Sequence, residues 1–258
     1  MVKTWVNHLR FIPIVLCGVL ILGTAEAETV TVLQVIDGDT CLLDDGRKFR
    51  YLGIEAPEKG DPKSKEATLA NNKLVGGKKI RFENGRPRQD RDGRLLAYVF
   101  VGDTFVNEEL LRQGYAHIRR PLAAKYRNIL LKSQEEARAA GRGIWAKAAG
   151  RHIAIATVHA DAEGDDRQNL NDEYIVIENR GNTPIDLTGW TVLDEANHRY
   201  LFPNFVLSAK VRLMLRTGLG KNTKSEIFWG SRRPIWNNDG DTIFIKDAEG
   251  SLILSYVY

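Results

Sequence analysis

Short runs of alternating apolar and polar residues dominate the chain between Thr29 and Val101. Such alternation is typical of strands that bury one face. Two turn sequences, Asp37-Gly38-Asp39 and Asp44-Asp45-Gly46, separate the first runs and favour hairpins. We therefore predict strands at Thr29–Ile36, Thr40–Leu43, Lys48–Ile54, Lys79–Phe82 and Leu95–Val101.

Three stretches between and after these strands have the composition of helices and are followed by the glycines that end them. The glycines are Gly76-Gly77, Gly114 and Gly141. Five strands with helices between and after them predict a small, partly open barrel of the oligonucleotide-binding type, an α+β fold. The helices are predicted at Ser64–Leu74, Val106–Gln113 and Leu122–Ala140.

From Ile153 onward the pattern changes to short strands at regular spacing, with no helical period. Turn clusters such as Arg180-Gly181-Asn182 separate the strands, which is typical of a two-sheet β-sandwich of about a hundred residues. The predicted strands are Ile153–Val158, Glu173–Asn179, Trp190–Leu193, Val211–Leu215, Thr242–Lys246 and Leu252–Val257. We therefore predict a multi-domain protein, with a barrel domain at residues 28–148 and an all-β immunoglobulin-like sandwich at residues 151–258.

The first 27 residues have the pattern of a signal peptide. Lys3 and Arg10 precede an apolar run from Phe11 to Leu22, and Ala25 and Ala27 form a cleavage site. The run is short of the roughly 20 residues that a membrane helix needs, although a retained anchor starting near Trp5 stays an alternative. We predict export to the periplasm or the medium, with no transmembrane span in the mature chain.

Charge and cysteine content differ from what a disulfide-stabilised or acidic protein would show. Residues 28–149 contain 23 Lys and Arg against 17 Asp and Glu, whereas residues 150–258 contain 12 against 15. A basic domain favours a polyanionic partner. Cleavage leaves Cys41 as the single cysteine, which excludes an intramolecular disulfide and a zinc site built from thiolates.

Four short elements carry candidate chemistry in the barrel domain: Asp37-Gly38-Asp39-Thr40, Arg50, Gly53 to Glu58, and Asp92-Gly93-Arg94. Each alone has an ordinary interpretation. An Asp-Gly-Asp turn usually closes a hairpin, and an arginine on a strand is usually a solvated edge charge. Acidic residues beside a proline often begin a helix, where they favour the helix dipole.

In this order and spacing the four elements resemble the staphylococcal-nuclease (thermonuclease) family. The resemblance covers residues 29–145 and includes Val106 to Gly114 and Gly143-Ile144-Trp145. It implies an oligonucleotide-binding barrel with three helices and a Ca²⁺-dependent phosphodiesterase that acts on DNA or RNA. The residues that it implies are Asp39, Glu55 and the main-chain carbonyl of Thr40 for calcium, Glu58 for activating water, and Arg50 and Arg94 for the phosphate.

The residue types suit this chemistry independently of the resemblance. A hard cation held by few carboxylates keeps open positions for a phosphate oxygen and a water. Guanidinium groups match phosphate geometry bidentately. A histidine base or a histidine metal site is disfavoured, because residues 28–258 contain only four histidines and none have paired metal-binding spacing.

The sequence departs from the family pattern at three places. Glu55 stands where the family often has aspartate, which changes the length of a predicted metal ligand. Arg120 and Leu122 stand where two tyrosines contact the nucleotide in the best-known member. We therefore predict that Arg119 and Arg120 bind substrate through phosphate attraction, with weaker stacking on bases. The segment between Glu58 and Ile80 is shorter, which trims a loop beside the site.

The second half resembles a lamin-tail domain. The resemblance rests on Asn171 to Asn179, Ile185 to Trp190, and Trp236 to Asp241. It implies attachment or protein contact without catalysis, so we predict an envelope or protein partner for this domain and nuclease activity that survives its deletion. An acidic loop at Asp161 to Asp166 is either a cation site or a solvated loop.

An alternative from another class remains open at this point. The chain could be a non-catalytic polyanion-binding or envelope-adhesion protein that uses the same folds. Replacing Glu58 by glutamine separates the two hypotheses, because only an enzyme would lose hydrolysis while keeping binding.

Overall fold

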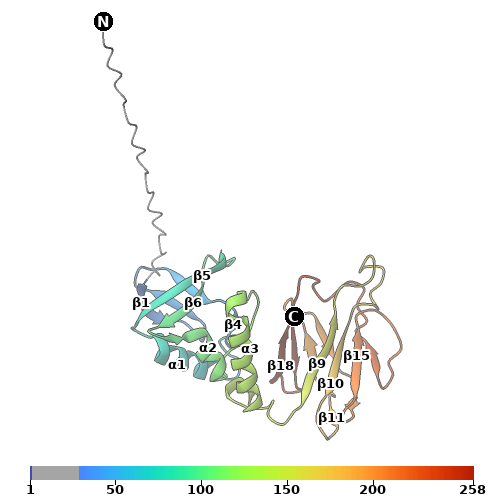
Figure 1. The fold of residues 1–258 in the computed structure, drawn as a ribbon. Helices are drawn as coiled ribbons and strands as arrows, with labels where there is room; N and C mark the ends of the chain where they lie inside the picture. Colours follow the sequence, from blue (N-terminus) through green and yellow to red (C-terminus); the bar gives the residue numbers. More distant parts are fainter. Residues whose placement is uncertain (2–28) are drawn as a thin grey trace.

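The computed structural model describes Met1 and residues 29–258. The predicted signal peptide at residues 1–27 lies, apart from Met1, outside the described residues. Figure 1 shows two regions, one of strands and helices coloured blue to green and one of strands coloured yellow to red. Within residues 29–258, no helix is long and apolar enough to cross a membrane.

The first region is a closed barrel, which confirms the predicted fold class. Its strands lie in the order β3-β2-β1-β5-β6-β7, and a parallel pairing of β3 with β6 closes the sheet. The prediction of a partly open barrel is thereby refined to a closed one. The strands are β1 (Thr29–Val35), β2 (Thr40–Leu43), β3 (Lys48–Tyr51), β5 (Lys79–Gln89), β6 (Leu95–Val101) and β7 (Thr104–Phe105).

Two predicted strand boundaries are wrong for identifiable reasons. The strand that begins at Lys48 ends at Tyr51, because Gly53 adopts a left-handed φ of 82° and turns the chain. A separate short strand β4 (Ile54–Glu55) then pairs with β8 (His117–Ile118). Strand β5 continues to Gln89 instead of ending at Phe82, because pairing with β6 resumes after an irregularity.

Helices cover the barrel where the sequence predicts them. Helix α2 (Val106–Arg112) contributes Asn107, which lies in the core with an exposed fraction of 0 %. Its side chain accepts the amide N–H of Val99 and donates to the carbonyl of Leu52, so it joins β6 to the segment after β3. The other helical elements are α1 (Ser64–Val75), α3 (Ala124–Ala139) and the 3₁₀ turn η1 (Gly143–Trp145).

The second region is a sandwich of two four-stranded sheets with a short strand pair, which confirms the predicted all-β fold. Trp190 and Trp236 lie in its core, as the burial of aromatic rings favours. The sheets are β16-β15-β10-β9 and β13-β12-β17-β18, with the pair β11-β14. The strands are β9 (Ile153–His159), β10 (Tyr174–Asn179), β11 (Ile185–Asp186), β12 (Thr191–Leu193), β13 (Arg199–Leu201), β14 (Val206–Leu207), β15 (Arg212–Arg216), β16 (Glu226–Phe228), β17 (Thr242–Lys246) and β18 (Leu252–Val257).

Strand β18 of the sandwich packs against the barrel region at α3 and β8, and Val257 belongs to the core of the barrel. The side chain of Gln134 on α3 accepts the amide N–H of Ile118 at 2.6 Å and donates to the carbonyl of Ser255 at 3.2 Å. Arg138 donates to the carbonyl of Ile253 at 3.0 Å. The two regions therefore share hydrogen bonds and apolar packing.

Candidate functional site

Asp39 is a buried carboxylate at the end of the turn between β1 and β2, with an exposed fraction of 3 %. It accepts the amide N–H of Ala56 at 2.8 Å and the hydroxyl of Thr40 at 3.1 Å. A side chain at Gly38 would meet the Cβ of Ala56 at 2.4 Å, so only glycine lets this turn lie so close to the β4 segment. The turn therefore fixes the position of the Asp39 carboxylate.

Burial raises the pKa of Asp39 to about 7, although the charge of Arg50 and the N–H of Ala56 act in the opposite direction. Removal from water disfavours the charged form of a carboxylate. The neighbouring cation therefore compensates only part of the cost of burying this charge. A second cation beside Asp39 would favour its ionised form.

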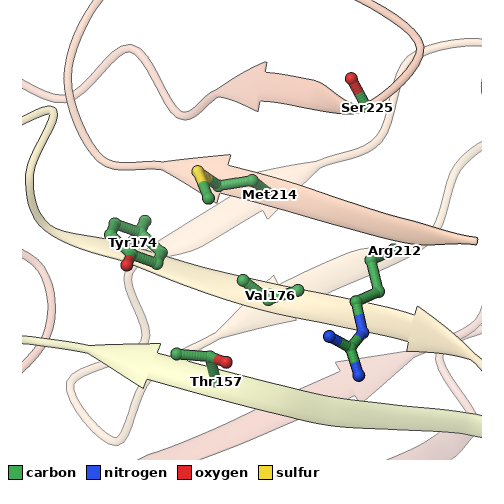
Figure 2. A pocket seen from close by; sticks show the side chains of 6 residues that line it. All are labelled: Thr157, Tyr174, Val176, Arg212, Met214 and Ser225. Atoms are coloured by element: carbon green, nitrogen blue, oxygen red, sulfur yellow. The ribbon is translucent and has the colours of Figure 1, made fainter.

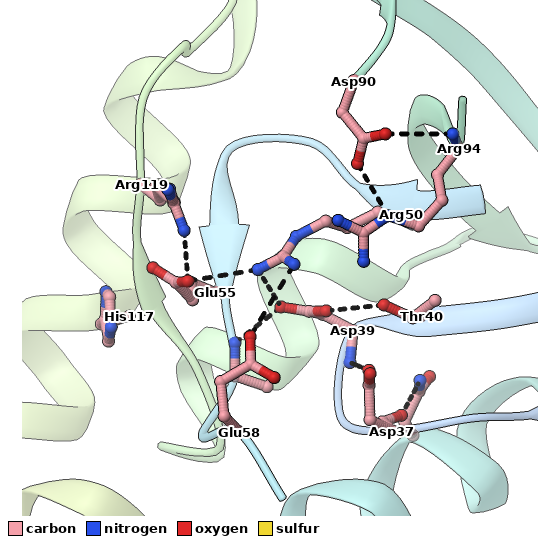
Figure 3. Close-up of polar contacts among 12 residues, drawn as sticks. Asp37, Asp39, Thr40, Arg50, Glu55, Glu58, Asp90, Arg94, His117 and Arg119 are labelled. Atoms are coloured by element: carbon pink, nitrogen blue, oxygen red, sulfur yellow. Dashed lines mark hydrogen bonds and ion pairs between the residues drawn. The ribbon is translucent and has the colours of Figure 1, made fainter. Parts of the chain in front are cut away.

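Arg50 on β3 lies at the centre of an acidic cluster, as Figure 3 shows. Its Nη2 atom is 3.3 Å from Asp39 Oδ2 and 3.2 Å from Glu55 Oε1, and its Nη1 atom is 3.9 Å from Glu58 Oε1. The side chain of Arg50 is 13 % exposed, whereas that of Glu58 is 66 % exposed. The cluster therefore runs from a buried carboxylate to one that faces solvent.

The β4–β8 pair places Glu55 and Arg119 beside this cluster. Glu55 lies opposite His117 in the strand register, and Arg119 follows β8 directly. The guanidinium of Arg119 donates to Glu55, and its amide N–H donates to the carbonyl of Gly53 at 3.1 Å. Arg119 therefore contacts the cluster through Glu55, which is a predicted metal ligand.

Arg94 lies at the start of β6 and bonds to a different pair of carboxylates. Its Nε atom donates to Asp90 at 2.7 Å and its Nη2 atom donates to Asp92 at 2.9 Å. Burial raises the pKa of Asp90, but the hydrogen bonds from Arg94 outweigh it and leave the pKa below the ordinary value. The contacts of Arg94 thus include neither Asp39, Glu55 nor Glu58.

Two predicted groups, the main-chain carbonyl of Thr40 and the side chain of Arg120, make their hydrogen bonds outside the cluster. The carbonyl of Thr40 accepts the amide N–H groups of Ile36 at 2.9 Å and Asp37 at 3.3 Å, so it closes the hairpin instead of facing the carboxylates. The side chain of Arg120 donates to the carbonyl of Asp239 at 2.7 Å. Docking of the sandwich thus directs Arg120 toward the second region.

Sequence reasoning missed Asp90 and His117 as neighbours of the site. Asp90 holds Arg94, a relation that its four-residue spacing could have indicated. His117 is the cross-strand neighbour of Glu55, and its ring centroid lies 5.1 Å from that of Phe244 in the sandwich. Burial lowers the pKa of His117, although Glu55 acts against this shift. No local pattern predicts this pairing, because it depends on how the two regions pack.

The donor atoms of the cluster suit a hard cation. Within residues 29–258, no group of three or more His, Cys, Asp or Glu side chains is arranged to enclose a metal ion. Asp39 and Glu55 both contact one nitrogen of Arg50, so their oxygens converge on a shared position. Oxygen-only sites with one or two carboxylates bind Mg²⁺ or Ca²⁺ together with water and phosphate. The residues present therefore fit such a cation.

The sandwich contributes a separate hollow and an acidic loop. The hollow, of about 350 Å³, lies over β9, β10 and β15, and Figure 2 shows its lining. Its lining contains no carboxylate or thiol: Thr157, Tyr174, Val176, Arg212, Met214 and Ser225. In the loop, Asp161 and Asp166 accept hydrogen bonds from Asn238 at 2.8 and 3.1 Å, which is an internal role.

Comparison with known proteins agrees with the class that the barrel, its three helices and its acidic cluster define. The family model described as "Staphylococcal nuclease homologue" matches residues 48–147, and that of the Lamin Tail Domain matches residues 146–258. The thermonuclease of Staphylococcus hyicus is 34 % identical over 135 residues, which are 48 % of this chain and 79 % of that protein. The thermonuclease of Staphylococcus intermedius is 34 % identical over 130 residues, covering 46 % and 77 %.

A third relative, endonuclease YncB of Bacillus subtilis, is 35 % identical over 130 residues, which are 46 % of this chain and 62 % of that protein. The chain therefore belongs to the family of staphylococcal nuclease homologues. It carries a lamin-tail domain after the family domain, as its sequence predicts. Both resemblances that the sequence indicates are confirmed.

Proposed function

We propose that this protein is an exported, calcium-dependent nuclease that hydrolyses phosphodiester bonds of DNA or RNA. The observation that carries the proposal is the position of Arg50, whose guanidinium lies within 3.9 Å of Asp39, Glu55 and Glu58. A group that binds phosphate thus contacts both candidate metal ligands and the candidate base. The names of the thermonuclease and endonuclease relatives support the same reaction class.

Asp39 and Glu55 would hold the calcium ion in this proposal. The ion, when bound, supplies Lewis-acid stabilisation of the negative charge that develops on the phosphate oxygens. Asp39 is prepared for this role by burial and by the fixed donors Ala56 N–H and Thr40 hydroxyl. Thr40 would hold the Asp39 carboxylate through this hydroxyl, because its carbonyl already accepts two amide N–H groups within the hairpin.

Glu58 acts as the general base. A water attacks phosphorus while Glu58 accepts its proton, the bond between phosphorus and the leaving sugar oxygen breaks, and that oxygen takes a proton from solvent water. The high exposure of Glu58 suits this role, because its carboxylate is open to both water and substrate. A positioned general base contributes a factor of ~10²–10⁴ to the rate.

The arginines bind the phosphate. Arg50 holds it beside the carboxylates, and hydrogen bonds to a charged group contribute roughly 1.5–3 kcal/mol each. Asp90 and Asp92 orient Arg94, which directly precedes β6. Because β6 pairs with β3, we assign Arg94 a contact with the phosphate from the β6 side and Arg50 one from the β3 side. Arg119 approaches through Glu55, and Arg120 contributes charge from the border with the lamin-tail domain.

Export and attachment complete the proposal. The pattern of Lys3, Arg10, the apolar run and Ala25-Glu26-Ala27 supports a cleaved signal peptide and a periplasmic or extracellular location. The lamin-tail domain, with its excess of acidic residues, supports attachment to an envelope component or a protein partner more than contact with nucleic acid.

Digestion of single-stranded DNA, double-stranded DNA and RNA by the purified protein tests the proposal. We expect release of acid-soluble nucleotides with millimolar calcium and none with chelator. Glu58→Gln should lower this rate by ~10²–10⁴ while retaining binding. Glu66→Gln is the matched control, since Glu66 lies on α1 and its carboxylate bonds to Lys63 instead of Arg50. Binding without any calcium-dependent hydrolysis would favour the non-catalytic alternative.

A further inference from the structure

The strand face that carries Arg50 also carries Lys48. Side chains alternate along β3, so Lys48 and Arg50 point outward while Phe49 and Tyr51 are buried. Two residues along a strand span about 6.6–6.8 Å, so the backbone of Lys48 lies that far along β3 from the backbone of Arg50. Across the described part of the chain, the side-chain ammonium group of Lys48 makes no hydrogen bond or ion pair, although its backbone pairs with Leu42 in the sheet.

Lys48 lines a hollow of about 290 Å³ between the β2–β3 turn and the start of β6. Arg94 lines the same hollow, together with one carboxylate, that of Asp92. Because Asp92 accepts a hydrogen bond from Arg94 at 2.9 Å, its charge is already compensated. Arg47 pairs with Asp45, and Arg94 pairs with both Asp90 and Asp92, so Lys48 supplies the uncompensated positive charge of the hollow. The full lining is Gly46, Arg47, Lys48, Gln89, Asp92, Gly93, Arg94 and Leu95.

The strand register places this hollow next to the proposed active site along β3 and β6. Strands β3 and β6 are parallel, and Phe49 pairs with Leu95 and Arg50 with Leu96. The same register places Lys48 opposite Arg94. Arg94, a candidate phosphate ligand, therefore lines the hollow beside Lys48.

We propose that the hollow beside Lys48 is a second phosphate subsite, which binds the phosphate next to the scissile one on the same nucleic-acid strand. This inference rests on the proposed nuclease function and names a further substrate-binding residue for it. The ammonium group of Lys48 matches the charge of a phosphate, and its place two residues from Arg50 on β3 matches a polymer whose charges follow one another along the chain. The protein should therefore prefer oligonucleotides to substrates that contain a single phosphate.

Substrates of different length test the subsite in the full chain. We expect Lys48→Ala to lower kcat/KM for a single-stranded hexanucleotide by about tenfold, the effect of losing one hydrogen bond to a charged group. The loss on a dinucleotide, which has one phosphodiester, should be several-fold smaller. Lys48→Arg should retain most of the preference for the hexanucleotide over the dinucleotide, because arginine keeps the positive charge.

Lys79→Ala is the matched control. Lys79 is an exposed lysine at the first position of β5, whereas Gln89 at the last position of that strand lines the hollow. Dinucleotides that bear an added 5′ or 3′ phosphate identify the side on which the subsite lies. Equal losses on dinucleotide and hexanucleotide, or equal effects of Lys48→Ala and Lys79→Ala, would overturn the subsite.

Binding measurements separate failure of the subsite from failure of the proposed function. In a Glu58→Gln background, Lys48→Ala should weaken hexanucleotide binding and reduce the slope of log K against log salt by about 0.7 for a single strand. If the wild type cleaves nothing with calcium, the proposed function fails, yet this binding difference still decides the subsite. An unchanged salt slope would contradict it.

Discussion

The two regions of the molecule both bury carboxylates, but they use them differently. In the barrel, the buried Asp39 shares the guanidinium of Arg50 with Glu55, which Arg119 also contacts, and with the exposed Glu58. In the lamin-tail domain, Glu173 accepts the amide N–H groups of Ile235 and Trp236 within the fold. Glu173 thus ties two backbone segments of its own domain together, whereas the barrel carboxylates surround a guanidinium that leads to the exposed Glu58.

The difference teaches which buried acids indicate a site. Asp241 in the lamin-tail domain is buried completely and accepts the amide N–H groups of Glu195 and Thr242. Burial raises the pKa of Asp241 as it raises that of Asp39, so a shifted pKa alone does not distinguish the two. What distinguishes Asp39 is a path through Arg50 to Glu58 at the surface.

The largest expected difference between the regions concerns catalysis. Arg50→Ala should lower the rate of calcium-dependent hydrolysis by ~10²–10³, because it removes a donor aimed at the developing phosphate charge. Arg212→Ala removes an exposed arginine that pairs with Glu178 in the lamin-tail domain, and it should leave the rate unchanged. Rates measured on one oligonucleotide compare the two variants directly. Similar losses would mean that the Arg50 cluster is not the catalytic centre.

A second difference concerns the core of the lamin-tail domain. Trp236→Ala should lower the free energy of unfolding by ~3–5 kcal/mol, because it leaves a cavity where a buried ring packs against Trp229 with centroids 5.6 Å apart. Tyr256→Ala, at a position that is 38 % exposed, is the control. Urea unfolding followed by tryptophan fluorescence gives both values. A loss below that of Tyr256→Ala would contradict a core position for Trp236.

The border between the regions provides a third test. Gln134→Ala should lower the free energy of unfolding by ~1–3 kcal/mol, because it leaves the amide N–H of Ile118 and the carbonyl of Ser255 without their buried partner. It should also weaken calcium-dependent hydrolysis, since Ile118 lies on the strand that pairs with Glu55. Lys132→Ala, an exposed position on α3, is the control.

This variant is a sharper test than deletion of residues 150–258. Deletion also removes Val257 from the barrel core, together with Glu195 and Asp239, which accept hydrogen bonds from Arg120. Independent domains would show two unfolding transitions, and Gln134→Ala would then lower only the stability of the barrel.

The smallest expected effect is a pH dependence within the lamin-tail domain. Burial raises the pKa of Glu173 above its unfolded value, even though hydrogen bonds to its carboxylate lower it. The folded state therefore binds the proton more tightly, and this group's contribution to stability is largest below the unfolded pKa of about 4.3 and falls as the pH rises through the folded pKa. The contribution of Asp90 has the opposite sign, since its pKa is lowered.

Glu173→Gln isolates the contribution of Glu173 ionisation to the free energy of unfolding, because glutamine does not titrate. The free energy of unfolding of the wild type, relative to Glu173→Gln, should decrease as the pH rises from 4 to 7. Asp90→Asn, measured in the same way, should show the wild type gaining relative stability over the lower part of this range. A pH-independent difference at position 173 would contradict the assignment.

The sequence by itself determined the order and the type of most elements in both regions. Alternation along β1 and β2, the turns at Asp37-Gly38-Asp39, and the glycines that end helices act over a few residues, so they predict local structure directly. The same local patterns placed Asp39, Arg50, Glu55 and Glu58 in one segment of the barrel. Their contact with one another follows from strand pairing and a single turn.

Only the tertiary structure decided the partners of the remaining charged side chains. Arg120 bonds to the carbonyl of Asp239, 119 residues further along the chain, and Gln134 bonds to Ser255, 121 residues away. Such contacts depend on how whole elements pack, since a side chain bonds to whichever donor or acceptor the fold brings within about 3 Å. No local pattern in the sequence contains that information.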